Sequence, residues 1–122
     1  MAVATGRCLD GSGLAPTATT CAAPDTAGHQ SWALQEWLDG TYGLKEQAEG
    51  FCLDDSPAYG LTTMPCYDSP FQRWTFATMN SGAVQVQNQK TGRCLDDSPA
   101  YGLQSMPCSA IALQSWQLNT AG

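Results

Sequence analysis

The chain has 122 residues, which suits one ordinary domain, and a formal net charge of -6 at pH 7. It holds only 5 Lys plus Arg residues and no basic cluster, so it lacks the cations that a nucleic-acid backbone or an anionic membrane surface requires. No apolar run in the sequence approaches the roughly 20 residues that span a bilayer. The composition therefore argues against nucleic acid as a partner and against insertion into a membrane.

A unit of about 42 residues occurs three times along the chain. Each unit contains a Cys-Leu-Asp motif, a second Cys 13 or 14 residues after the first, and then Gln-x-Trp. A fixed period of this kind indicates a repeat architecture. One such unit is too small to bury its own hydrophobic face, so the three units are expected to share one core. We predict one domain over 1–122, with unit one at about 5–46, unit two at about 47–88 and unit three at about 89–122.

Each unit predicts about four short strands and no long helix. In chain order these lie around Cys-Leu-Asp, around the second Cys, around Gln-x-Trp and after it. The clearest is 83–87, which alternates apolar and polar residues after the turn residues 80–82 and has a counterpart near 41–46. The stretch 61–66 contains Pro65 near its end, which suits an edge strand. Regular short strands between turns indicate a closed all-β barrel or sandwich.

The strand that follows Trp in units one and two has no obvious third copy. Only 1–4 and 117–122 remain for it, so we expect this strand to be short, truncated or replaced. An uncovered strand edge can pair with another chain. The sequence therefore allows a monomer or a dimer formed through this edge.

The cysteines indicate three disulfides. Six cysteines allow 15 connectivities, but equivalent units favour pairing within each unit. The expected bonds are Cys8–Cys21, Cys52–Cys66 and Cys94–Cys108. Closing a loop of about 14 residues stabilises a fold by roughly 3 kcal/mol. Disulfides imply a secreted, extracellular protein, and we read the chain as a mature form with an added initiator Met.

These motifs resemble the ricin B-chain-like, or R-type, β-trefoil lectins. Three Gln-x-Trp motifs at equal spacing behind three Cys-Leu-Asp cassettes are typical of that family, and the match extends over 5–118. The resemblance implies an all-β β-trefoil with pseudo-threefold symmetry and one sugar site in each unit. It also places the Trp of each unit, Trp32, Trp74 and Trp116, in the core. No residue set requires a cofactor, and a single histidine rules out a histidine-rich metal site.

Sugar recognition needs an aromatic face and fixed polar groups. In the resembled family the Asp of Cys-Leu-Asp binds adjacent hydroxyls, although an Asp there could instead cap a turn. Tyr59 and Tyr101 are the predicted stacking residues, with covering of a disulfide as the alternative. Asp55 and Asp97 are expected to be turn residues, because neighbours on a strand point to opposite faces. The predicted sugar-binding residues are Asp10, His29 and Gln30 in unit one, Asp54, Tyr59, Thr62, Phe71 and Gln72 in unit two, and Asp96, Tyr101, Gln104 and Gln114 in unit three.

Unit one departs most from the pattern. It has Gly11 where the other units have a second Asp, and it has no tyrosine in the corresponding loop. We therefore expect a weakened or inactive first site. Two residues before the second Cys, where the resembled family often has an aromatic residue, the units have Thr19, Met64 and Met106.

The sequence is interpreted as a multivalent lectin of the hemagglutinin type that binds terminal hexoses on glycans. Galactose-type sugars lead on family grounds, with L-rhamnose or mannose as further candidates. The alternatives are a carbohydrate-binding module of a secreted glycoside hydrolase and a protein-binding trefoil such as a protease inhibitor. Catalysis is not expected: Asp54 and Asp55 point apart, which defeats a glycosidase pair, and His29 has no nucleophile motif around it.

Overall fold

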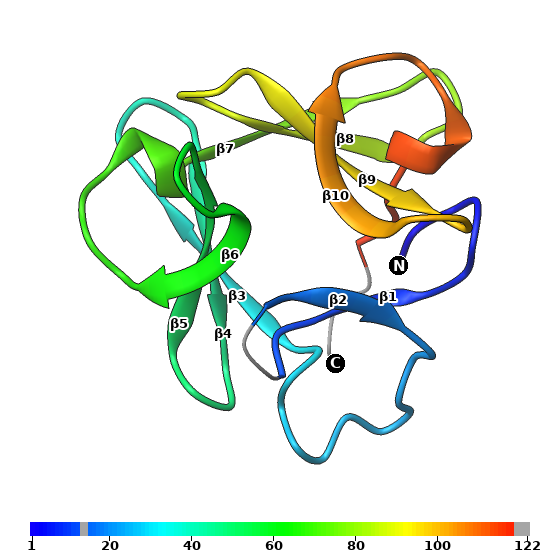
Figure 1. The fold of residues 1–122 in the computed structure, drawn as a ribbon, viewed down its shortest axis with the longest axis horizontal. Helices are drawn as coiled ribbons and strands as arrows, with labels where there is room; N and C mark the ends of the chain where they lie inside the picture. Colours follow the sequence, from blue (N-terminus) through cyan, green and yellow to red (C-terminus); the bar gives the residue numbers. More distant parts are fainter. Residues whose placement is uncertain (13–14, 119–122) are drawn as a thin grey trace.

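The computed structural model describes residues 1–12 and 15–118. Strands and two short 3-10 helices make up its regular structure, and Figure 1 shows the long hairpins arranged around a common centre. The elements are β1 (Cys8–Asp10), β2 (Thr17–Thr19), β3 (Trp32–Glu36), β4 (Tyr42–Glu46), β5 (Phe51–Ser56), β6 (Gly60–Pro65), η1 (Pro70–Gln72), β7 (Trp74–Thr78), β8 (Val84–Asn88), β9 (Arg93–Ser98), β10 (Gly102–Pro107) and η2 (Ala112–Gln114). The predicted all-β trefoil is confirmed.

The sheet carries the repeat in its pairing. One sheet runs β10-β9-β8-β7-β4-β5-β6, with β3 paired to β4, and β1 pairs β2 in a separate small sheet. The order makes β6 an edge strand, as Pro65 near its end predicted. The hairpins β5–β6 and β9–β10 have the same register, because their sequences are nearly identical over ten residues.

The hydrophobic core is made from equivalent residues of the three units. Its buried members are Ala2, Leu44, Leu53, Trp74, Val86, Leu95 and Trp116. The expectation for the tryptophans is correct for Trp74 and Trp116, which are 0% and 3% exposed. It is wrong for Trp32, which is only half-buried and packs at the edge of the core. The hairpin in front of Trp32 has strands of three residues, where its counterparts have six, and so covers less of the ring.

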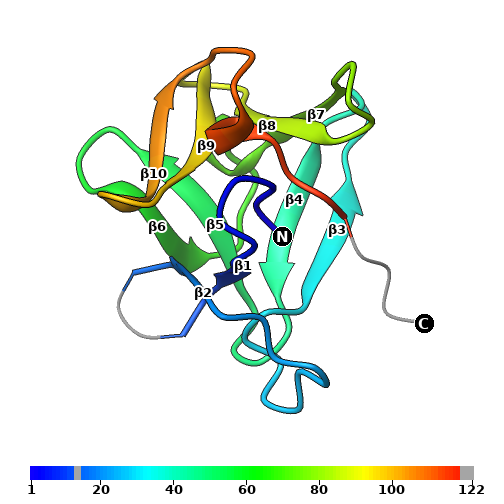
Figure 2. The ribbon, with the colours of Figure 1, turned by 90° about the vertical axis from the view of Figure 1, so that its right-hand side faces the viewer.

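Unit three is not built like the other two after its second Cys. The expected four strands are present in units one and two, whereas Trp116 forms isolated bridges to Ala2 and Val84 in place of a strand. The backbone of Met1 and Val3 exchanges hydrogen bonds of 2.8–2.9 Å with Gln117 and Ser115. The N-terminal segment thus replaces the missing strand, as Figure 2 shows, and residues 119–122 of the other candidate segment lie outside the described residues. Dimerisation through this edge stays a prediction.

All three expected disulfides are confirmed, each closing one unit: Cys8–Cys21, Cys52–Cys66 and Cys94–Cys108. The Cα–Cα distances of 5.0–5.1 Å are normal for such bonds. Each disulfide joins the two strands of a hairpin near its base. Among the described residues, no helix has the length and apolar character needed to cross a membrane.

Candidate functional site

In every unit the glutamine of Gln-x-Trp holds the aspartate of Cys-Leu-Asp. The glutamine Nε2 donates to the aspartate Oδ2 at 3.0–3.2 Å in the pairs Gln30–Asp10, Gln72–Asp54 and Gln114–Asp96. The second N–H of each amide donates to a backbone carbonyl near the second Cys, and the amide oxygen accepts a backbone N–H just beyond it. Both donors of each glutamine are therefore used inside the protein, and the glutamine positions the aspartate.

The tryptophan two residues later completes this arrangement. Its indole N–H donates to the carbonyl of the leucine just before the aspartate, at 3.0–3.1 Å, in the pairs Trp32–Leu9, Trp74–Leu53 and Trp116–Leu95. The Gln and Trp side chains of each Gln-x-Trp motif thus hold the Cys-Leu-Asp motif of the same unit. The Gln amide bonds the Asp carboxylate, and the Trp indole bonds the Leu carbonyl. The same contacts form although the aspartate and the glutamine are 20 residues apart in unit one and 18 apart in units two and three.

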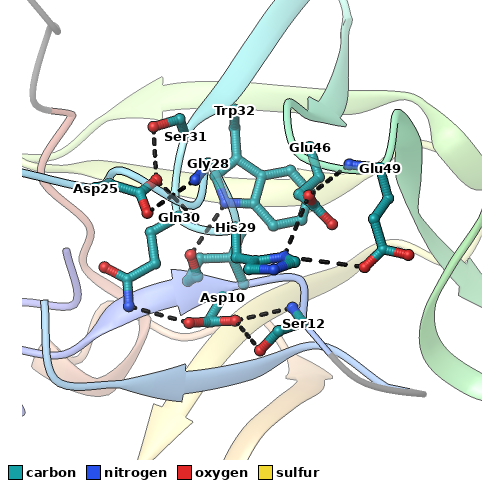
Figure 3. Close-up of polar contacts among 11 residues, drawn as sticks. Asp10, Ser12, Asp25, Gly28, His29, Gln30, Ser31, Trp32, Glu46 and Glu49 are labelled. Atoms are coloured by element: carbon teal, nitrogen blue, oxygen red, sulfur yellow. Dashed lines mark hydrogen bonds and ion pairs between the residues drawn. The ribbon is translucent and has the colours of Figure 1, made fainter. Parts of the chain in front are cut away.

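The three aspartates differ in the oxygen that the glutamine does not use. In unit one, Oδ1 of Asp10 accepts from both the backbone N–H and the hydroxyl of Ser12, at 2.8 and 2.5 Å (Figure 3). In unit three, Oδ1 of Asp96 accepts one long bond of 3.4 Å from Gln104. In unit two, Oδ1 of Asp54 has no hydrogen-bond donor among the described residues. Unit two therefore offers the most available carboxylate oxygen.

The hairpins place the other predicted residues around these carboxylates. Thr62 is directly opposite Asp54 in the β5–β6 register, and Gln104 is opposite Asp96 in β9–β10. Directly opposed residues share one face of a hairpin, so each pair lies on the same surface. Tyr59 and Tyr101 occupy the hairpin tips and are 76% and 83% exposed, which leaves their rings free to contact a ligand.

The remaining predicted residues lie just before each glutamine. Phe71 of η1 and His29 occupy equivalent positions, and both are half-buried. Phe71 presents its carbonyl to Asn88 at 2.7 Å, whereas the imidazole of His29 faces two glutamates (Figure 3). The equivalent positions have therefore diverged, one toward an apolar surface and one toward a charged cluster.

The prediction that Asp55 and Asp97 are turn residues is wrong. Both lie inside strands and are buried, 2% and 0% exposed. The carboxylate of Asp55 accepts from the hydroxyls of Thr91 and Ser105 at 2.6 and 2.8 Å, and both donors belong to unit three. The carboxylate of Asp97 accepts hydrogen bonds from Thr5 and Arg7, which belong to unit one. The side chains leave the sugar face, as strand alternation requires, and connect each unit to the next.

The pKa values of two of the site carboxyls are shifted in opposite directions, because hydrogen bonds outweigh burial at Asp10 but not at Asp54. Burial raises the pKa of Asp54, and the nearby charge of Asp55 adds to this, while the hydrogen bond from Gln72 opposes it. Burial also acts on Asp10, but the bonds from Ser12 and Gln30 outweigh it and lower the pKa of that carboxyl. The contact from Ser12 was predictable, since a short polar residue two positions after Asp is typical of a side-chain turn, whereas no local pattern indicates the effect of Gln30 on this pKa.

A hollow of about 180 Å³ opens beside the second disulfide, and Gln72 is among its lining residues. Its lining residues include Trp37, Tyr67 and Asp68, and the guanidinium of Arg73 covers the ring of Trp37 at 4.6 Å. Asp54 does not line this hollow. The candidate sugar sites are instead shallow surfaces over the hairpins, where a fixed carboxylate can accept hydroxyl donors through charge-assisted bonds.

The fold, together with the Gln–Asp and Trp–Leu hydrogen bonds repeated in each unit, defines a β-trefoil of the lectin type. The sequence matches the family model described as ricin-type beta-trefoil lectin domain over residues 1–116, and the chain belongs to that family. The family match supports carbohydrate binding. A search of curated protein sequences found no match.

Solved structures with low sequence identity share the fold. ThreeFoil, a designed threefold symmetric protein, aligns with a TM-score of 0.88 at 20% identity, covering 99% of this chain and 96% of its own. The GlcNAcα1-4Gal-releasing endo-β-galactosidase from Clostridium perfringens aligns at 0.81 and 14%, covering 94% of this chain and 30% of the enzyme. The Polyporus squamosus lectin, bound to a human-type influenza-binding epitope, aligns at 0.69 and 12%, covering 84% and 40%.

Proposed function

We propose that the chain is a secreted, multivalent lectin of the hemagglutinin type, without enzymatic activity of its own, that binds terminal hexoses through units two and three. The observation that supports this most strongly is the bracketed Asp54, whose Oδ2 is held by Gln72 while Oδ1 has no donor among the described residues. A carboxylate held in this way can accept hydroxyl groups without first being oriented, which reduces the entropy that binding would otherwise lose. Tyr59 at the hairpin tip supplies the aromatic face for the sugar ring.

We rank the expected sugar affinity of the three sites by the protein hydrogen bonds that already occupy Oδ1 of the aspartate. Unit two binds best, because a sugar hydroxyl displaces nothing there. In unit three a ligand competes with the long bond from Gln104, or recruits that amide as a further contact. In unit one the ligand would have to displace two short bonds from Ser12, so this site is the weakest.

Galactose-type sugars are the leading ligands on family grounds, with L-rhamnose and mannose next. One shallow site gives about millimolar affinity, and joined sites on one rigid body raise avidity by roughly 10²–10⁴ on a glycan-coated surface. Agglutination of cells is therefore the expected activity.

The test is a glycan array followed by titration with the sugar that it selects. The variants are Asp10→Asn, Asp54→Asn and Asp96→Asn, because asparagine keeps an oxygen to accept from the bracketing glutamine. The exposed Asp68→Asn serves as the control, since it removes the same charge outside the hairpins. Binding should fall most in Asp54→Asn, less in Asp96→Asn and least in Asp10→Asn. Agglutination should be lost in the double variant that combines Asp54→Asn with Asp96→Asn. Full binding in that double variant would discredit the assignment.

A second candidate function is a carbohydrate-binding module of a secreted glycoside hydrolase. It is favoured by the likeness to the endo-β-galactosidase, of which the chain covers only 30%. Such a module would bind polysaccharide without agglutinating cells. A protein that binds no glycan at all would instead point to a protein-binding trefoil, such as a protease inhibitor.

A further inference from the structure

The contact between unit one and unit two is built differently from the other two unit contacts. Unit two reaches unit three through Asp55, and unit three reaches unit one through Asp97. Unit one has Gly11 at that position, and a Cβ placed there would lie 2.7 Å from Oε2 of Glu46. Glu46 occupies the position that Asn88 has in the next unit. The backbone carbonyl of Glu46 accepts from Gly50, and that of Asn88 accepts from Gly92 in the same way. The carboxylate at this contact is thus supplied by the end of β4 and not by the strand position that Gly11 occupies.

The relocated carboxylate is incompletely satisfied. Glu46 is 0% exposed, and its Oε1 accepts the backbone N–H of Glu49 at 3.0 Å. Its Oε2 is buried and has no hydrogen-bond partner among the described residues. Nδ1 of His29 is buried and equally without a hydrogen bond, 3.5 Å from Oε1 of Glu46 and 3.9 Å from Oε1 of Glu49 (Figure 3). Buried polar atoms are nearly always paired, so this group lacks a partner.

We propose that His29, Glu46 and Glu49 bind one divalent cation of the zinc class between units one and two. One ligand atom from each residue lies within 4.8 Å of the others. Bonds of about 2.0–2.2 Å in a tetrahedron put ligand atoms roughly 3.3–3.6 Å apart, so small side-chain shifts complete the geometry. Two carboxylates balance the charge of the ion, and the imidazole nitrogen favours zinc over magnesium or calcium.

The exposure of the three ligands gives the ion a route and an open position. The side chains of His29 and Glu49 are 31% and 46% exposed, whereas that of Glu46 is fully buried. The ion enters from solvent, and water occupies its fourth position. Because Glu46 ends β4 and Glu49 precedes β5, the bound ion ties unit one to the start of unit two and stabilises the folded chain.

The test uses tag-free, disulfide-intact protein dialysed against a chelator and then titrated with ZnCl2. We expect one zinc per chain by calorimetry, and a rise in Tm of about 10 °C at a hundredfold excess over Kd. His29 is the sole histidine, so its imidazole NMR signals report the site directly and should shift with zinc. A simple ion pair between the imidazole and Glu46 would leave these signals unchanged by zinc and would overturn the proposal.

The repeat supplies variants that should fold. His29→Phe, Glu46→Asn and Glu49→Thr each install the residue that unit two or three has at the same position. Each should abolish zinc binding and the rise in Tm, while Glu36→Gln, an exposed carboxylate outside the cluster, should retain both. Unchanged stoichiometry in His29→Phe would refute the site. Sugar binding by units two and three is measured alongside, because it should not depend on zinc.

Discussion

Asp97 is the most informative residue for testing how the units are joined. It lies in β9 and is 0% exposed, and its side-chain partners among the described residues are Thr5 and Arg7 of unit one. Arg7 donates to both carboxylate oxygens, from Nε at 3.1 Å and from Nη2 at 2.6 Å, and the hydroxyl of Thr5 donates as well. Replacing Arg7 with Met keeps the aliphatic part of the side chain and leaves the buried carboxylate with one neutral donor.

The magnitude follows from the burial of the two partners. Removing one partner of a fully buried ion pair destabilises a protein by about 3–5 kcal/mol. The side chain of Arg7 is 32% exposed, so water can reach part of the vacated space and the loss should be smaller. We expect Arg7→Met to lower the free energy of unfolding by about 2–4 kcal/mol and the Tm by roughly 10 °C.

Arg93 provides a matched control in the same protein. It occupies the same position of its unit, but within the part of the chain that the structure describes its guanidinium donates to the carbonyl of Ser105 alone. The equivalent acid, Asp55, is satisfied by hydroxyls. Arg93→Met should therefore cost less than about 1 kcal/mol. Both variants are compared by urea and thermal unfolding with disulfides intact. Equal losses would show that Asp97 does not hold the units together as described.

Three further outcomes are expected. The raised pKa of Asp54 means that its carboxylate takes up a proton at a higher pH than an ordinary Asp. A titration of sugar binding should therefore show unit two losing affinity on acidification at a higher pH than an ordinary Asp would cause. Replacing Cys94 and Cys108 together with Ala should lower the free energy of unfolding by about 3 kcal/mol in urea, because a 14-residue loop is released. Gly11→Ala should cost about 1–3 kcal/mol by overpacking against Glu46, and denaturant unfolding should show a smaller loss when Glu46→Asn is already present.

The fold was predictable because its information is periodic. Equal spacing of the Gln-x-Trp motifs, each behind a cystine cassette, predicted three hairpins, and the structure has them, with shorter strands in the first. The strand 83–87 and the edge position of 61–66 followed from alternation and from Pro65. These signals are local, since each depends on residues that are neighbours along the chain.

The errors concern contacts between residues far apart in the sequence. Asp97 was taken for a turn residue because its partner Arg7 lies 90 residues away. The role of Ala2 was equally hidden: nothing local indicates that a buried alanine at the chain start bridges Trp116. The sequence does not predict the cluster of His29, Glu46 and Glu49, because these residues are separated along the chain and come from two units.

Under the proposed function, recognition and stability would depend on the same hydrogen bonds. Asp54 is both the proposed acceptor of sugar hydroxyls and the partner of the buried Gln72, so Asp54→Ala would strand a buried amide donor as well as remove the ligand contact. The hydrogen bond between the glutamine and the aspartate is therefore kept in every unit. Under the proposal, differences in affinity come from residues outside this arrangement, such as Ser12 and Gln104, which donate to the second carboxylate oxygen. Ser12→Ala should consequently strengthen unit one, and an unchanged first site would mean that something other than Oδ1 availability limits it.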